Sequence, residues 1–282
     1  IYTLSLHDAL PIYELHQIFK LAKSDLRKTY SGAALGWSWA VIKPAVTIFV
    51  YWFAFSVGLR QRAGIEGFPF FLWLIAGIVP WFYISEMWSG GPNAMRRYKF
   101  LITKMKFPTS TIPTFVSMSK LTVHFVLIVI VILIYLTAGY GMSIYYLQIP
   151  FYMFMMFIMA TGWTLIASVM GAMSKDFGNL VKSFTQALFW FSGIMWPVSN
   201  IENIWGKRLL LANPVTYIVE GYRNCFIHHK WFWETPGVTV VYICELAFMW
   251  ILAIWAYKNL KKEMPDEVRR SEERRVGKEC RS

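Results

Sequence analysis

Six apolar segments, each about as long as a membrane crossing, constrain this chain more than any other feature. The hydrocarbon core of a bilayer is about 30 Å thick, which roughly 20 residues of apolar helix span. The chain is 56% hydrophobic and only 16% charged, and a water-soluble fold would struggle to bury so much apolar surface. We therefore predict an all-α integral membrane protein with six transmembrane helices in one domain over residues 35–258. The predicted spans lie near 37–59, 68–92, 112–138, 149–173, 180–198 and 237–257.

The two ends of the chain are interpreted separately from this core. One DNA segment, read on opposite strands, encodes both TLSLHDALPI (3–12) and SEERRVGKE (271–279). A sequencing adapter at each end would produce this relation. We therefore interpret residues 1–12 and 270–282 as translated adapter and leave them out of the fold. Residues 259–269 are expected to form a cytoplasmic tail.

Residues 13–30 have the pattern of an amphipathic helix. Leu15, Ile18, Phe19, Ala22 and Leu26 fall on one face, and lysines and arginines lie on or beside the other. Such a helix lies in the membrane interface, where anionic lipid attracts it. We expect an interfacial helix within 13–34, with an ordinary cytosolic helix as the alternative.

A basic loop separates the second and third predicted spans. The stretch RRYKFLITKMKFP (96–108) carries five positive charges and no acid. Tyr98, Leu101, Ile102 and Met105 recur at helical spacing, which predicts one apolar face on a short helix. A basic loop between two spans belongs on the cytoplasmic side, where a soluble partner can push on it. The positive charges are those of Arg96, Arg97, Lys99, Lys104 and Lys106.

The distribution of lysine and arginine predicts the orientation of the chain. Six spans place both termini on one side of the membrane. Fourteen of these residues fall in the segments of that side and six in the segments of the other side. An excess of positive charge marks the cytoplasmic side, so both termini are expected to be cytoplasmic in a bacterial inner membrane. The fourteen are Lys20, Lys23, Arg27, Lys28, Arg96, Arg97, Lys99, Lys104, Lys106, Lys175, Lys182, Lys258, Lys261 and Lys262; the six are Arg60, Arg62, Lys207, Arg208, Arg223 and Lys230.

The chain lacks the motifs of a nucleotide-hydrolysing or metal-dependent enzyme. No G-x-x-x-x-G-K-[ST] loop occurs, so ATP hydrolysis is expected on a separate partner that holds the ATP and Mg²⁺. His228 and His229 are adjacent and would diverge by about 100° on a helix, so no metal site is expected. An intramembrane transferase would need clustered acids or histidines. The four ionisable residues in or near the spans, Glu86, Lys120, His124 and Glu245, are scattered in the sequence.

A basic pair and a set of aromatic side chains are candidates for the path of a substrate. Lys120 and His124 are spaced i, i+4 and form a basic patch suited to an anionic substrate, although a lysine that snorkels to the interface is equally compatible with the pattern. Aromatic side chains in the middle of a span can stack on sugar rings, although interfacial belts explain many of the chain's aromatics. The aromatic candidates are Tyr51, Trp52, Phe53, Trp81, Phe82 and Tyr83.

The stretch 199–235 is too polar to span and too long for a turn. Asn213-Pro214 divides it, and we predict two short helices that dip back into the outer leaflet. Glu220 and Arg223 are spaced i, i+3 and are expected to pair there as part of an outer gate that also includes Asn213 and Pro214.

Five stretches carry a resemblance to the membrane subunits of ABC-2 type exporters of the polysaccharide class. They are LRKTYSGAALGWSWAVIKP (26–44), LIAGIVPWFYISE (74–86), KMKFPTSTIP (104–113), SKDFGNLVKSF (174–184) and NPVTYIVEGYRN (213–224). Within that class, VYWFAFSVGLR (50–60) followed by 74–86 is most similar to teichoic-acid translocation permeases. The chain departs from the pattern at Lys175, where related chains often carry arginine before the aspartate.

The resemblance implies two copies of this chain, two copies of a separate ATPase, and a lipid-linked anionic or neutral polysaccharide as cargo. It also implies that a cytoplasmic coupling helix contacts the ATPase, and it assigns no nucleic acid as a partner. Rival interpretations are an ABC-2 permease for small drugs or lipids, an O-antigen or capsule exporter, and a passive channel. The residues implied in ATPase coupling are Arg96, Arg97, Lys99, Leu101, Lys104, Met105, Lys106, Phe107, Lys175 and Asp176.

Overall fold

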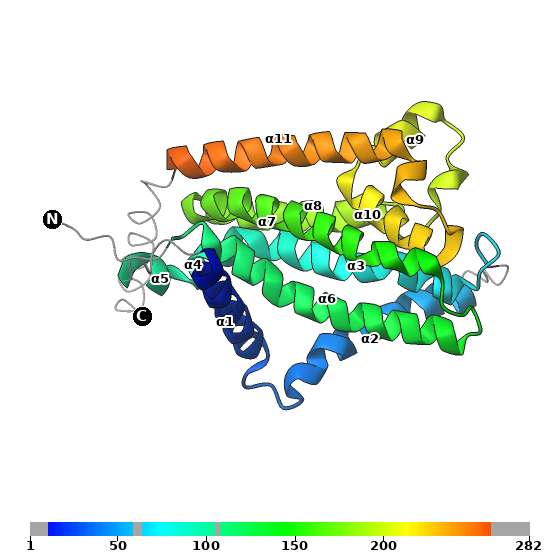
Figure 1. The fold of residues 1–282 in the computed structure, drawn as a ribbon, viewed down its shortest axis with the longest axis horizontal. Coiled ribbons are helices and arrows are strands. Elements are labelled where there is room, and N and C mark those ends of the chain that lie inside the picture. The colour runs from blue at the N-terminus through cyan, green and yellow to red at the C-terminus, as the bar shows by residue number, and fades with distance from the viewer. Residues whose placement is uncertain (1–10, 59–63, 105–107, 261–282) are drawn as a thin grey trace.

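A computed structural model describes residues 11–58, 64–104 and 108–260 (Figure 1). Every regular element in these residues is a helix, and the one β-bridge, between Ile65 and Phe68, is isolated. The predicted all-α fold is therefore confirmed.

Five helical segments of the described chain are long and apolar enough to cross a membrane, and they match five of the six predicted spans. The first, Gly36–Gly58, combines η2 (Gly36–Ser38), α2 (Trp39–Phe53) and η3 (Ala54–Gly58). The second, Phe70–Arg97, combines α3 (Phe70–Gly90), η4 (Gly91–Asn93) and α4 (Ala94–Arg97). The others are α6 (Thr111–Thr137), η5 (Ile144–Gln148) with α7 (Ile149–Met173), and α11 (Pro236–Leu260).

The segment predicted to be the fifth span, 180–198, is built differently. Helix α8 (Lys175–Trp190) has 16 residues, about 24 Å, and ends in a turn in which Gly193 has a φ of +63°. Helices α7 and α11 run parallel, since Tyr242 and Trp250 of α11 bond to the carbonyls of Met155 and Ile158. The chain between them must therefore return along the bundle, and α8 with the turn that follows makes this return. Its crossing of the lipid stays a prediction.

Helix α3 lies at the centre of the bundle. Fourteen of its 21 residues are buried, and they lie on all sides of the helix. A helix that is apolar all round is suited to this position. Helices α2 and α11 lie at the rim, where apolar side chains such as Phe49 and Trp255 are exposed as lipid-facing side chains would be.

The connecting segments gather at the two ends of the bundle as the charge pattern predicts. One end holds α1 (Pro11–Tyr30), α4, α5 (Lys99–Lys104), the α7–α8 turn and the end of α11 (Figure 1). The other end holds residues 64–69, 138–148 and most of 191–235. The basic segments thus share one end, which we call the inner end. The remaining elements are η6 (Val198–Asn200), α9 (Ile204–Leu211), α10 (Pro214–Arg223), η7 (Asn224–His228) and η8 (Phe232–Glu234).

Helix α1 uses its apolar face in two ways. Ile18, Ala22 and Leu26 pack against the core, mostly on α6. Leu15 and Phe19, from the same predicted face, are exposed. This division fits a helix that rests on the bundle and offers its first turns to the membrane interface.

Candidate functional site

The basic loop at the inner end forms two short helices rather than the one predicted over 96–106. Helix α4 continues α3 as far as Arg97, Tyr98 leaves the helical conformation with φ −111° and ψ 28°, and α5 follows. The expectation of one continuous helix was wrong because Tyr98 is drawn into the core. Its ring packs edge-on against Phe115 with centroids 4.8 Å apart.

A buried carboxylate ties this break to α1. Asp25 is 2% exposed and accepts a hydrogen bond from the Tyr98 hydroxyl. The Arg97 guanidinium lies 3.9 Å from the same carboxylate, and Lys28 lies over the Tyr98 ring. Burial first, and then the bond to Asp25, raises the pKa of Tyr98, so the hydroxyl stays a donor. Helix α1 and the basic loop are therefore joined through one acid.

Several residues predicted to contact an ATPase also hold the inner end together. Arg96 donates to the carbonyl of Ala172 at 3.2 Å, at the end of α7, and Arg97 lies beside Asp25. Leu101 packs against the core from α5. Lys99 and Lys104 begin and end α5. Met105, Lys106 and Phe107 lie outside the described residues.

The start of α8 lies close to this loop. Lys175 is its first residue, and Asp176 is exposed in its first turn. The connection is tight, because a Cβ at Gly171 would meet the backbone of Pro92 in η4 at 2.1 Å. The predicted coupling residues of 96–104 and 175–176 thus share the inner end of the bundle.

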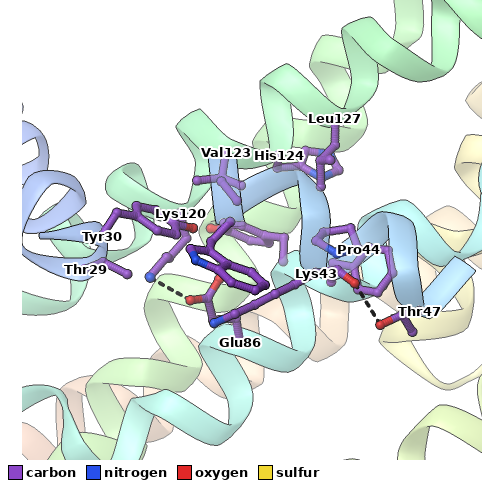
Figure 2. A pocket seen from close by; sticks show the side chains of 14 residues that line it. Thr29, Tyr30, Lys43, Pro44, Thr47, Glu86, Lys120, Val123, His124 and Leu127 are labelled. Carbon is purple, nitrogen blue, oxygen red and sulfur yellow. Dashed lines mark hydrogen bonds and ion pairs between the residues drawn. The ribbon is translucent and has the colours of Figure 1, made fainter. Parts of the chain in front are cut away.

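A cavity of about 210 Å³ opens between α1, α2, α3 and α6 near the inner end (Figure 2). Lys120 Nζ lies 2.6 Å from Glu86 Oε1, and this ion pair crosses the cavity from α6 to α3. Lys120 is 5% exposed, whereas the side chain of Glu86 is 46% exposed. Lys43 of α2 and Tyr30 of α1 also line this space, which we call the inner cavity. Burial and the nearby Glu86 carboxylate raise the pKa of Tyr30 to about 12.

Only part of the predicted substrate path meets in this cavity. Phe82, Tyr83, Lys120 and His124 line it. Trp81 lies elsewhere and packs on Phe189 at 5.5 Å between ring centroids.

The mid-span aromatic cluster is divided in the same way. Tyr51 stacks on Phe189 at 5.4 Å, Trp52 lines a separate apolar cavity and Phe53 is exposed. Consecutive helical residues point about 100° apart, so three neighbours in sequence do not share one wall.

His124 connects the inner cavity to the outer hairpin, by which we mean α9 and α10. Its Nε2 lies 2.7 Å from the Tyr222 hydroxyl of α10. The other ring nitrogen, Nδ1, is buried without a hydrogen-bond partner in the described residues. Tyr83 and Ser117 form a further buried bond of 2.5 Å beside it. A polar contact therefore runs through the bundle from α6 to α10.

The outer hairpin has the two short helices that the sequence predicts, α9 and α10. Asn213 caps α10 by accepting from the amide of Val215 at 2.9 Å, and Pro214 is the first residue of the helix. The Asn213 amide also donates to the Phe191 carbonyl and to Ser192 Oγ. One side chain thus fixes both the start of α10 and the turn after α8.

Arg223 is the most buried charge of the hairpin, with no exposed surface. Its guanidinium pairs with Glu220 at 2.7 Å, as predicted, and lies 3.6 Å from the centroid of the Trp73 ring. It also donates to the carbonyls of Gly193 and Ile194 at 2.7 and 2.8 Å. Arg223 therefore joins α10 both to α3 and to the turn that ends α8.

Sequence reasoning missed the partners of these charges. Asp25 is an acid on the apolar face of α1, and a charge at such a position was the one sign in the sequence that it has a buried partner. Glu86 is noticeable as a charge within a span, but its pairing with Lys120 depends on how α3 and α6 pack. Glu66 and His228, whose side chains lie 3.5 Å apart at the outer end, are far apart in sequence and gave no signal. Within the described residues, no group of histidine, cysteine and acidic side chains has the arrangement of a metal site.

Known proteins match the chain over most of its length. The ABC-2 type transporter family profile matches residues 16–227. The O-antigen export system permease protein RfbA of Myxococcus xanthus is 24% identical over 265 residues, covering 92% of this chain and 98% of that protein. Its namesake from Klebsiella pneumoniae is 24% identical over 223 residues, covering 77% and 83%. The polysialic acid transport protein KpsM of Escherichia coli is 23% identical over 198 residues, covering 70% and 75%.

The matched region extends from α1 through α10 and includes the basic loop, the inner cavity and the outer hairpin. The family profile thus matches more than half of the chain. Together with the all-helical bundle, it shows that the chain belongs to the ABC-2 type transporter family.

Proposed function

We propose that this chain is the membrane subunit of an ATP-driven exporter of a lipid-linked cell-envelope polysaccharide. The names of its relatives, O-antigen and polysialic acid export proteins, support a polysaccharide as cargo. They favour an O-antigen or capsule polymer, while teichoic acid is the cargo of the permeases that the sequence motifs most resemble. The working unit is two copies of this chain with two copies of a separate ATPase in a bacterial inner membrane, with both termini cytoplasmic.

The continuity of α3 with the basic loop carries the mechanism. The span Phe70–Arg97 begins at the outer end and runs through α3, η4 and α4 to the break at Tyr98. Near its outer end, Trp73 and Gly77 contact Arg223 of the hairpin. A displacement of the loop by a partner would therefore move the central helix and, through Arg223, the outer hairpin. Packed cores transmit such displacements because they deform little.

The inner end offers the surface for such a partner. Phe100 is 61% exposed on α5, and Lys99 and Arg97 lie next to it on the exposed side of the loop. An exposed apolar side chain beside positive charge is suited to insertion into a groove with acidic rims. Helix α1 would follow the movement because Asp25 ties it to Tyr98.

The test is charge reversal of the basic loop. Lys104→Glu with Lys106→Glu should abolish export and the stimulation of ATP turnover, while membrane insertion stays intact. Lys207→Glu with Arg208→Glu, on the exposed α9 at the outer end, is the matched control and should leave both activities unchanged. Unchanged export by the loop variant would remove the lever mechanism.

The cargo is tested separately. The chain is co-purified with its partner ATPase and reconstituted with lipid-linked O-antigen, capsular polysaccharide or teichoic acid. The polymer that raises ATP turnover and crosses the membrane identifies the substrate class. Export of any of them without an ATPase would contradict the proposed function.

A further inference from the structure

A second cavity adjoins the inner cavity and continues it toward the outer end. It measures about 180 Å³, lies between α2, α3 and α6, and shares Pro44 and Leu127 with the inner cavity. Its walls are apolar and include Ile48, Val79 and Ile134. We call it the apolar cavity. The two cavities thus lie side by side, with charged groups in the inner cavity, which we call the charged end, and none in the lining of the apolar cavity.

The charged end has an excess of positive charge. Lys120 and Lys43 both line it, while Glu86 is its one acid. In Figure 2 the Lys43 and Lys120 side chains reach toward Glu86 from different helices. Lys120 is paired with Glu86, whereas Lys43 makes no ion pair with any side chain of the described chain. Two ammonium groups against one carboxylate favour an additional negative charge.

The protonation of Tyr30 adds a hydrogen-bond donor to this end. A pKa of about 12 keeps its hydroxyl protonated at physiological pH. Tyr30 lies at the end of α1, so the interfacial helix forms one wall of the charged end. A group with several acceptor oxygens, such as a phosphoryl group, suits two ammonium groups and a hydroxyl.

We propose that the two cavities bind a phosphorylated lipid, with its phosphoryl group between Lys43 and Lys120 and its chain in the apolar cavity. Glu86 pairs with Lys120 when the site is empty, and the phosphoryl group displaces the Glu86 carboxylate from Lys120. Because the Glu86 side chain is 46% exposed, it can turn toward water without being buried unpaired. The charged end lies near the inner end of the bundle, so the lipid would come from the cytoplasmic leaflet.

Two kinds of lipid share this chemistry. One is the phosphate-bearing anchor of a lipid-linked polymer, and the other is an anionic phospholipid of the bilayer. The first would make the cavities the place where the cargo enters, which rests on the proposed function. The second would make them a site for a bound bilayer lipid. Binding itself can be measured without an ATPase, so failure of this inference is distinguishable from failure of the proposed function.

The experiment measures binding to the full chain in phosphatidylcholine nanodiscs. The probes are radiolabelled polyprenyl phosphate, phosphatidylglycerol and inorganic phosphate. Lys43→Gln should weaken binding of the lipid probes about tenfold, the loss expected for one charged hydrogen bond. Lys43 is exposed, so this variant should fold. Lys182→Gln, an exposed lysine on α8 outside both cavities, is the matched control and should bind as the wild type does.

Glu86→Gln provides the decisive contrast because it removes the internal competitor for Lys120. It should tighten binding several-fold, whereas weaker binding would show that Glu86 organises the site and would overturn the proposal. Unchanged binding by Lys43→Gln would overturn it as well.

The probes identify the occupant. Tighter binding of polyprenyl phosphate than of phosphatidylglycerol supports the polymer anchor, and equal binding supports a bilayer lipid. Inorganic phosphate that binds as well as either lipid would overturn the role of the apolar cavity.

Discussion

The two ends of the bundle bury a basic side chain in opposite ways. At the outer end, Arg223 has no exposed surface, and both of its terminal nitrogens are paired with oxygens of Glu220, Gly193 and Ile194. At the inner end, Lys120 is also buried, but its one ion-pair partner within the described residues is the half-exposed Glu86 across an open cavity.

The difference separates a structural contact from an exchangeable one. A charge buried in protein is stable only when its hydrogen bonds are satisfied, and removing a partner leaves a large penalty. The partners of Arg223 are mostly backbone carbonyls, which cannot leave without unfolding the turn after α8. The partner of Lys120 is a side chain that can rotate into water. The outer contact is therefore suited to transmitting movement, and the inner contact to exchanging one anion for another.

Removing the arginine should have the largest effect. Arg223→Ala removes the arginine partner of Glu220, which among the described residues keeps only His228 at 3.9 Å, and deprives two buried carbonyls of their donor, so we expect a loss of about 3–5 kcal/mol in the free energy of unfolding. Thermal unfolding in detergent measures it. Arg208→Ala, an exposed arginine on α9, should change stability by less than about 1 kcal/mol. Equal losses of stability for the two variants would show that the contacts of Arg223 do not stabilise the fold.

A smaller effect should follow from crowding the same contact. A Cβ at Gly77 would lie 2.7 Å from the Arg223 guanidinium, so Gly77→Ala should displace it at a cost of about 1–3 kcal/mol. Gly90→Ala is the matched control, because it lies on the same helix and its Cβ would meet no atom within 4 Å. Thermal unfolding of the two variants should therefore differ. If Gly77→Ala is as stable as the control, the guanidinium has room to move.

These contacts show what the sequence alone can predict. The lengths of the apolar runs predict the long helices, and the positive charges predict which connections share an end, because both depend on local composition. The pairing of Glu220 with Arg223 follows from i, i+3 spacing. The contacts of Arg223 with Trp73 and Gly193 join residues far apart in sequence, and only the packing of α3, α8 and α10 brings them together.

The same reason explains one error at the inner end and the separation of three neighbouring substrate-path candidates. The basic loop has the periodicity of one helix, but a tertiary bond from Tyr98 to Asp25 breaks it. Residues 51–53 are consecutive candidates for the substrate path, yet the structure places them against different neighbours. Periodicity describes one element at a time, and it carries no information on which element will lie opposite.

The tie between α1 and the loop should be weaker than the outer contact. Tyr98→Phe removes the donor to Asp25, while Arg97 remains near the carboxylate, so a loss of about 1 kcal/mol is expected. Hydrogen exchange of the α1 amides should then be several-fold faster, since this helix opens locally. Tyr140→Phe, an exposed tyrosine at the outer end, should leave that exchange unchanged.

The smallest effect on stability should come from Glu86→Gln, and this variant tests the comparison most directly. It removes the carboxylate that pairs with the buried Lys120. In a site without water, the loss of one partner of a buried ion pair costs about 3–5 kcal/mol. Because the inner cavity is open, water can solvate the Lys120 ammonium in place of the carboxylate, and the cost should fall below about 1 kcal/mol. Thermal unfolding beside Arg223→Ala measures the difference. A loss as large as that of Arg223→Ala would mean that Lys120 depends on Glu86 as Arg223 depends on its carbonyls. Lys120 would then be held by Glu86 and would not be released to bind a phosphoryl group.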